Sequence, residues 1–316
     1  MTQIRGHMPA TRRPGKIGVH SLDHFGFAVP DIAQAQDFYI SFGLDCRVNS
    51  NRLELYTFGS PHRWINITEG SSKRLGYLSF GVFEEDFGRF RLLLKECNIE
   101  FERSPLESDN NSVWFRDNNG ILIEVKVADK SSPNDKSTFA ATPSSPAGER
   151  GATTRRKIQS IQPRRLAHVV VFVRDVAASI NFYTNTLGLK LSDQAGEVAF
   201  MHAIHGSDHH LIALVQSSSV GFHHCSWDVP SIEEIGLGAM QMANRGYVRG
   251  WGLGRHVLGS NYFHYVRDPW GSYCEYSADM DYIPVTMDWE GQTHVPEDAF
   301  YLWGPSPPPD FVTNYE

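Results

Sequence analysis

The chain repeats part of its own sequence after 144 residues, and this duplication limits the possible folds more than any other feature. The stretch LDHFGFAVPDIAQAQDFYISFGL begins at Leu22, and LAHVVVFVRDVAASINFYTNTLGL begins at Leu166, so that His24 aligns with His168. Later in the chain, FRDNNGILIEV also matches VRDPWGSYCEY. Two matches in the same order indicate a duplicated domain rather than one short motif.

Each copy has the pattern of a mixed α/β unit. HFGFAV and HVVVFV are rich in Val and Phe, which favours strands, and Asp31 and Asp175 follow as N-caps of segments with helical spacing. A second strand–helix–strand set follows in each copy. We therefore predict an α+β protein with two tandem domains of two βαβββ modules each. The predicted parts are a first domain at 1–127, a Ser- and Pro-rich linker at 128–163, and a second domain with a proline-rich tail at 164–316.

Composition excludes some classes of function. The 29 basic and 36 acidic residues give a net charge of −7, which argues against a nucleic-acid-binding surface. The N-terminal residues lack the apolar core of a signal peptide, and no apolar run reaches membrane-spanning length. The four cysteines form no C-x-x-C pair and so predict no zinc ribbon. We expect a cytoplasmic protein without nucleic-acid or membrane partners.

The two copies differ at one of three aligned polar positions. Ten of the 14 histidines lie at or beyond position 168, in the second copy. Alignment of GYLSFGV with HHCSWDV places Tyr77 opposite His224. The first copy then holds His24, Tyr77 and Glu124, and the second holds His168, His224 and Glu275. The second copy alone has two imidazoles and a carboxylate at these positions.

Those three residue types form a known metal-binding set. Two His and one carboxylate bind Fe(II) on one face and leave other positions open. Each residue also has an ordinary explanation, because a strand His is usually structural, Glu275 can be a salt-bridged acid, and only one of His223 and His224 can face inward. Aromatic and small residues surround Glu275, however, and burying an unpaired carboxylate is costly. We therefore predict that His168, His224 and Glu275 are metal ligands.

The chain resembles the extradiol catechol dioxygenases, of the catechol 2,3-dioxygenase and dihydroxybiphenyl dioxygenase type, within the vicinal oxygen chelate superfamily. Three motifs carry this resemblance: LAHVVVFV with His168, FHHCSWDV with His224, and GRHVLGSNYFHYVRDPWGSYCEY with Glu275. The last motif is long and specific, whereas the first is weak alone. The resemblance covers nearly the whole chain. It implies that the modules of each domain form an open, incomplete barrel of the glyoxalase-like fold, and that the first domain has lost its metal.

The same resemblance implies an acid/base histidine fifteen residues before the second metal ligand. That spacing falls on His209, and the apolar strand that follows supports the match. His210 is the rival, and His202 and His205 are more distant ones.

Other residues would contact the substrate. The resemblance places hydrogen bonds to its oxygens on His256 and Tyr265, which also count as catalytic residues. Val170 lies two residues after His168 and so shares its face of a strand. The predicted substrate contacts are Val170, Phe200, Trp251, His256 and Tyr265.

The implied activity is extradiol cleavage of a catechol-type aromatic diol by O2 in the breakdown of aromatic compounds. The product would be of the 2-hydroxymuconic semialdehyde type, the cofactor Fe(II) or else Mn(II), and the assembly a homo-oligomer, with a tetramer favoured. One alternative is a glyoxalase or thiol transferase of the same superfamily. A metal-free binding module is the other, and the intact triad of the second copy argues against it.

Overall fold

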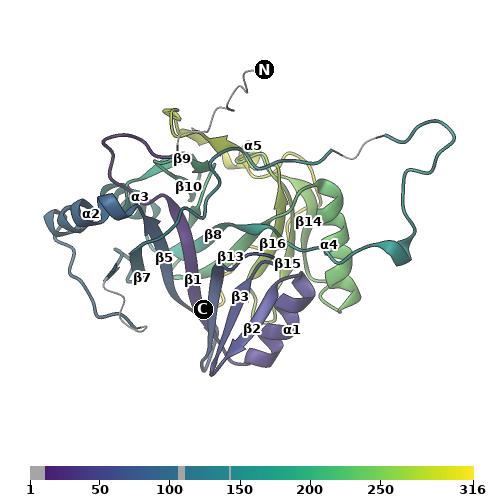
Figure 1. The fold of residues 1–316 in the computed structure, drawn as a ribbon, viewed down its shortest axis with the longest axis horizontal. Helices are drawn as coiled ribbons and strands as arrows, with labels where there is room; N and C mark the ends of the chain where they lie inside the picture. The colour runs from purple at the N-terminus through teal and green to yellow at the C-terminus, as the bar shows by residue number, and fades with distance from the viewer. Residues whose placement is uncertain (1–10, 106–110, 142–143) are drawn as a thin grey trace, which may run out of the picture.

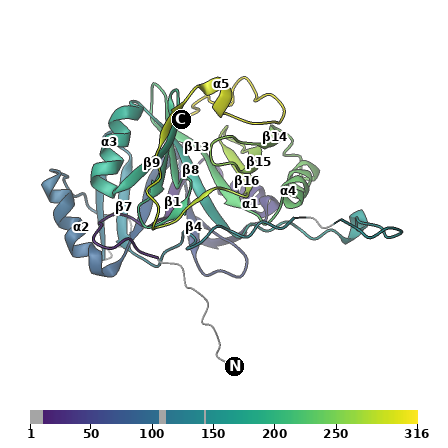
Figure 2. The same cartoon turned by 90° about the horizontal axis from the view of Figure 1, so that it is seen from above.

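The computed structural model describes residues 11–105, 111–141 and 144–316. Two large open β-sheets dominate it, one for each copy of the repeat, and the helices lie on their outer flanks (Figure 1 and Figure 2). Within these ranges no helix combines the length and the apolar character needed to cross a membrane. The α+β class and the open sheets predicted from the sequence are confirmed.

The first sheet has seven strands in the order β2-β3-β4-β1-β5-β7-β6. Its central strand β1 pairs in parallel with β4 and antiparallel with β5. Burial is nearly continuous along β1, so both faces of this strand are covered. The strands are β1 (Ser21–Val29), β2 (Asp45–Asn49), β3 (Arg52–Tyr56), β4 (Arg63–Glu69), β5 (Arg74–Val82), β6 (Ser112–Arg116) and β7 (Leu122–Val127).

The second sheet has nine strands in the order β14-β15-β16-β13-β8-β12-β10-β9-β18. Here β8 takes the place of β1, since it pairs in parallel with β12 and antiparallel with β13. A separate pair joins β11 (Ser207–Asp208) to β17 (Tyr282–Ile283). The nine strands are β8 (Arg165–Val173), β9 (Leu189–Ala195), β10 (Val198–Ala203), β12 (Ile212–Gln216), β13 (Gly221–Asp228), β14 (Gly250–Arg255), β15 (Tyr262–Arg267), β16 (Tyr273–Ala278) and β18 (Gln292–His294).

The helices complete the modules. In the first half, the second module is shorter than predicted among the described residues, because a single bridge between Glu102 and Trp114 stands where its extra strand was expected. The helices are α1 (Ile32–Phe42), α2 (Glu84–Glu96), α3 (Val176–Leu187), α4 (Ile232–Asn244), the short α5 (Pro296–Ala299) and the 3-10 turn η1 (Arg155–Lys157).

The same signals delimit the first helix of each half. The Asp31 side chain accepts a hydrogen bond from the N–H of Gln34 at 2.9 Å, and the Asp175 side chain accepts one from Ala178 at 2.8 Å. Both are the predicted N-caps. Each helix ends at a glycine in the left-handed conformation, Gly43 and Gly188.

Two matching turns, one in each half, form hydrogen bonds to the opposite half. Oδ1 of Asp117, between β6 and β7, accepts two main-chain N–H groups of its own turn, and Oδ1 of Asp268, between β15 and β16, does the same. Each Oδ2 accepts a hydrogen bond from the opposite half: Tyr183 donates to Asp117 at 3.0 Å, and Lys73 donates to Asp268 at 2.5 Å. The core is also shared, because the rings of Phe25 and Phe222 stack at 5.2 Å.

The described residues of the predicted linker, 128–141 and 144–163, and those of the tail have defined positions. The main chain of Ala140 donates to the carbonyl of Pro230, the residues from 144 to 160 are mostly exposed and project from the body (Figure 1), and Ile161 is buried again. The proline-rich tail lies over the second half, as expected, and Phe311 is buried there. This position brings the tail to the site described next.

Candidate metal centre

Three neighbouring strands position the predicted ligands. His168 lies on β8, His224 on β13 and Glu275 on β16, and β13 runs between the other two strands. Ser226 on β13 is the register partner of both His168 and Glu275. Because alternate strand residues share a face, His224 points to the same side as Ser226 and thus toward the other two ligands.

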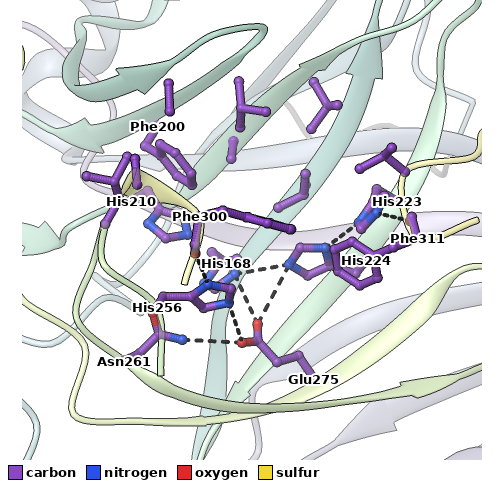
Figure 3. A pocket seen from close by; sticks show the side chains of 18 of the residues that line it. His168, Phe200, His210, His223, His224, His256, Asn261, Glu275, Phe300 and Phe311 are labelled. Atoms are coloured by element: carbon purple, nitrogen blue, oxygen red, sulfur yellow. Dashed lines mark hydrogen bonds and ion pairs between the residues drawn. The ribbon is translucent and has the colours of Figure 1, made fainter. Parts of the chain in front are cut away.

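The three side chains converge (Figure 3). The Nε2 atoms of His168 and His224 lie 3.3 Å apart, and Oε2 of Glu275 lies 3.4 Å from the first and 3.7 Å from the second. All three residues are buried. Among the residues that the structure describes, theirs is the only group of three His, Cys, Asp or Glu side chains found close enough to share an ion.

The chemistry of these donors fits a divalent metal ion. Oε2 of Glu275 is buried and has no hydrogen-bond partner, which is costly for a carboxylate unless a cation compensates it. Burial lowers the pKa of His224 well below its usual value, so the imidazole is neutral and keeps a lone pair for a metal. These residues can therefore hold the ion that the sequence predicted.

A hydrogen-bonded neighbour orients His224. Nε2 of His223 donates to the Phe311 carbonyl at 2.7 Å, so Nδ1 of His223 accepts from Nδ1–H of His224 at 2.5 Å. The remaining nitrogen of His224, Nε2, then presents its lone pair to the other ligands. Such outer partners fix the tautomer of a metal-bound histidine. The tail thus supports the site through one main-chain carbonyl.

A cavity of ≈ 280 Å³ opens beside the triad. Its walls are mostly apolar and come from β10, β12, α5 and the tail, and none of the described lining residues is Lys or Arg. The main apolar contacts are Val198, Phe200, Ala213, Val215, Phe300 and Phe311.

His256 and Tyr265 form a pair at the cavity wall. Nδ1 of His256 donates to the Phe300 carbonyl at 2.8 Å, so its Nε2 accepts from the Tyr265 hydroxyl at 2.9 Å. Burial, with Glu275 close by, raises the pKa of Tyr265 well above 10, so this side chain stays a neutral phenol. Asn261 donates to Oε1 of Glu275 at 3.2 Å and leaves Oε2 for the metal.

The structure places His210, not His209, at the cavity. The His210 ring lies 4.1 Å from the ring of His168, whereas Nε2 of His209 donates to Asp193 at 2.8 Å. The spacing argument chose His209, and both residues lie between β11 and β12, where strand alternation does not fix the side-chain direction. His202 and His205 do not line the cavity; they bond to Ser192 and to the main chain of Arg13.

Besides His256 and Tyr265, three residues were predicted to contact the substrate, and two of them line the cavity. Val170 and Phe200 do so, but Trp251 does not. The Trp251 ring stacks behind Tyr265 at 5.5 Å between centroids and donates to the Pro305 carbonyl, so it supports the wall from outside. Sequence analysis missed Asn261, although it lies within the motif that carries Glu275, and Phe300, which lies outside all three motifs.

The aligned positions of the first half form no metal site. The Tyr77 hydroxyl lies 3.0 Å from Nε2 of His24, and Nδ1 of His24 bonds to Asp23 at 2.7 Å. Glu124 accepts from Ser79 at 2.6 Å instead of bonding to His24, which lies 3.9 Å away. His24 and Glu124 therefore have separate hydrogen-bond partners.

Comparison with known proteins agrees with this geometry. The profile of the Glyoxalase/Bleomycin resistance protein/Dioxygenase superfamily matches residues 165–276, which contain all three ligands. In solved structures the fold resembles a Mn(II)-bound glyoxalase from Novosphingobium aromaticivorans, with a TM-score of 0.75, 21% identity and 95% of each chain covered. It also resembles BphC, a halotolerant catechol dioxygenase, with a TM-score of 0.74, 18% identity, and 94% of this chain and 98% of that one covered. The chain thus has the fold of these proteins, and its site has the donor set for a metal ion.

Proteins with similar sequences identify the family within this superfamily. The chain is 48% identical to Metapyrocatechase 2 of Cupriavidus necator over 313 residues, which cover 99% of this chain and 97% of that one. It is 25% identical to 2,2',3-trihydroxybiphenyl dioxygenase of Sphingomonas paucimobilis, over 78% of this chain and 82% of that one. The chain belongs to the extradiol catechol dioxygenases of the vicinal oxygen chelate superfamily.

Proposed function

We propose that the protein cleaves a catechol-type aromatic diol by adding O2 beside the two hydroxyl groups, giving a 2-hydroxymuconic semialdehyde-type product. The observation that carries this proposal is the buried His168–His224–Glu275 triad beside a largely apolar cavity. Both atoms of O2 enter the product, so the reaction needs no further reductant.

Fe(II) is the proposed cofactor, with Mn(II) as the alternative for this ligand set. When bound, such an ion lowers the pKa of a coordinated diol hydroxyl and brings diol and oxygen together at one centre. His168, His224 and Glu275 would hold it.

The remaining polar residues orient the diol and move its protons. The His256–Tyr265 pair lies at the cavity wall, where it would hydrogen-bond the diol oxygens and fix the plane of the ring. His210, in place of His209, is the proposed acid/base, because its ring lies between Phe200 and the ligand His168. General acid–base help of this kind contributes about 10²- to 10⁴-fold to a rate.

The cavity favours an uncharged substrate. A carboxylated catechol would bury its carboxylate among apolar side chains, with no described Lys or Arg in the wall to pair with it. We therefore propose catechol and methylcatechols as substrates, with a trihydroxylated or biaryl diol as the second candidate.

Oxygen consumption tests this function directly. Protein loaded with Fe(II) under anaerobic conditions and then mixed with catechol in air should take up one O2 per diol and turn yellow. A catechol with a carboxylate on its ring serves as the control and should react more slowly. Full iron loading without oxygen uptake on any of these diols would contradict the proposal.

The domain boundaries, the homo-oligomer and the cytoplasmic location stay predictions. The proposed boundaries at 127 and 164 are supported by the sheets, because β7 ends at Val127 and β8 begins at Arg165. The tetramer has its support in the resemblance alone.

A further inference from the structure

The second half contains two tandem histidine pairs with the same arrangement. In each pair the second ring, His210 or His224, lines the cavity, and its Nδ1 faces the Nδ1 of its neighbour. His223 also reaches the cavity wall, whereas His209 does not. The neighbour then bonds through Nε2 to a fixed acceptor. For His223 that acceptor is a tail carbonyl, and for His209 it is the carboxylate of Asp193.

Asp193 is itself held firmly. It is buried on β9, where Oδ2 accepts from Nε2 of His209 at 2.8 Å. Oδ1 accepts from Nε2 of His294 at 2.8 Å and from the main-chain N–H of Gln292 at 3.1 Å. Burial alone would raise the pKa of Asp193, but the hydrogen bonds from His209 and His294 lower it, so the side chain is a carboxylate at neutral pH.

The protonation of the two rings follows from this carboxylate. A carboxylate only accepts hydrogen bonds, so Nε2 of His209 carries the hydrogen and its Nδ1 carries a lone pair. Nδ1 of His210, 3.1 Å away, then donates to that lone pair. The Nε2 atom of His210 is left with its own lone pair, on a ring that borders the cavity.

We propose that Asp193 is a positioning residue which, through His209, holds His210 as the tautomer able to accept a proton from the substrate. This role rests on the proposed function. In the step concerned, an O–H bond of the diol breaks and an N–H bond forms at Nε2 of His210.

If Asp193 had only a structural role, its loss would lower the stability of the protein without a specific effect on proton transfer. Asp193 also bonds to two residues of β18, so its loss would loosen that strand. An experiment must therefore separate proton transfer from stability.

The Asp193→Asn variant provides this separation. Its amide nitrogen cannot accept, so one histidine partner loses its acceptor or changes tautomer. We expect kcat on catechol to fall about 10- to 100-fold, the range for outer partners of a site, while KM and metal content stay close to wild type. The solvent deuterium isotope effect on kcat should rise, because proton transfer becomes slower. The matched control is Gln292→Ala, which keeps the main-chain donor on the same strand and should leave kcat unchanged.

The results of these measurements test the role of Asp193 and the proposed function separately. Wild-type kcat in Asp193→Asn, or a lower kcat with an unchanged isotope effect and lost metal, overturns the role of Asp193. If that variant does not fold, His209→Gln takes its place, with the same expected fall in kcat and rise in the isotope effect. Wild-type protein without ring cleavage defeats the proposed function itself, whereas active wild type with an unaffected variant defeats only this inference.

Discussion

The two halves of the molecule hold the same three positions and use them differently. In the second half, His168, His224 and Glu275 converge with one carboxylate oxygen unpartnered. In the first half, the Tyr77 hydroxyl occupies the place of an imidazole and bonds to both His24 and Asn66, at 3.0 and 2.6 Å. With Tyr77 in place of a histidine, the first half has a hydrogen-bonded cluster where the second half has a cation site. The metal site differs from its counterpart because one buried donor atom, Oε2 of Glu275, has no hydrogen-bond partner.

The largest expected effect is loss of the metal from the triad of the second half. The His168→Ala variant should lose the metal, because two remaining donors cannot replace a three-residue set that leaves the other positions open. The measurement is metal content per chain after anaerobic loading with Fe(II) and removal of excess ion.

The matched control is the aligned residue of the first half. His24→Ala should keep the wild-type metal content, since Tyr77 and Glu124 lie in a cluster with no metal role. Equal metal loss in both variants would show that the halves do not differ as described.

A smaller effect is expected at the paired turns. Asp268→Asn removes the carboxylate from Lys73, whose side chain is only 4% exposed, and leaves a buried cation unpaired. The expected loss is about 3–5 kcal/mol in the free energy of unfolding, measured by denaturant titration.

Asp117→Asn is the comparison variant. Burial raises the pKa of Asp117, so the folded protein loses stability as the pH rises and this carboxyl ionises. Its partner Tyr183 is neutral, and an amide oxygen can still accept the two main-chain N–H groups. We expect a change within about 1 kcal/mol at neutral pH. Equal losses in the two variants would mean that the charge of Lys73 is unimportant.

Removal of the Tyr77 hydroxyl should cost less stability than Asp268→Asn. Tyr77→Phe leaves His24 and Asn66 without their shared partner, which should cost about 1–3 kcal/mol of unfolding free energy. Thermal unfolding measures the loss, and metal content should not change. An unaltered melting temperature would indicate that water replaces the hydroxyl.

The sequence alone was sufficient for the duplicated fold and the metal triad. Both depend on regular strands: alternation places His224, and register brings His168 and Glu275 to either side of Ser226. Sequence reasoning left the choice between His209 and His210 open, because the two residues lie between β11 and β12, where counting from a distant ligand does not fix the side-chain direction.

Tertiary packing explains what else sequence reasoning missed. Trp251 is two strands away from Glu275, and its ring was displaced from the cavity by Tyr265, which lies in front of it. Phe311 lines the cavity because the tail folds back, and no periodic pattern in a proline-rich segment predicts where it will lie.

The crossed turns also limit how such a chain can evolve. Asp268 finds its partner Lys73 in the opposite half, and Asp117 likewise depends on Tyr183. A recombination event that exchanged one half for that of a distant relative would have to import a compatible partner at the same moment. The two halves would therefore have to change together at these positions.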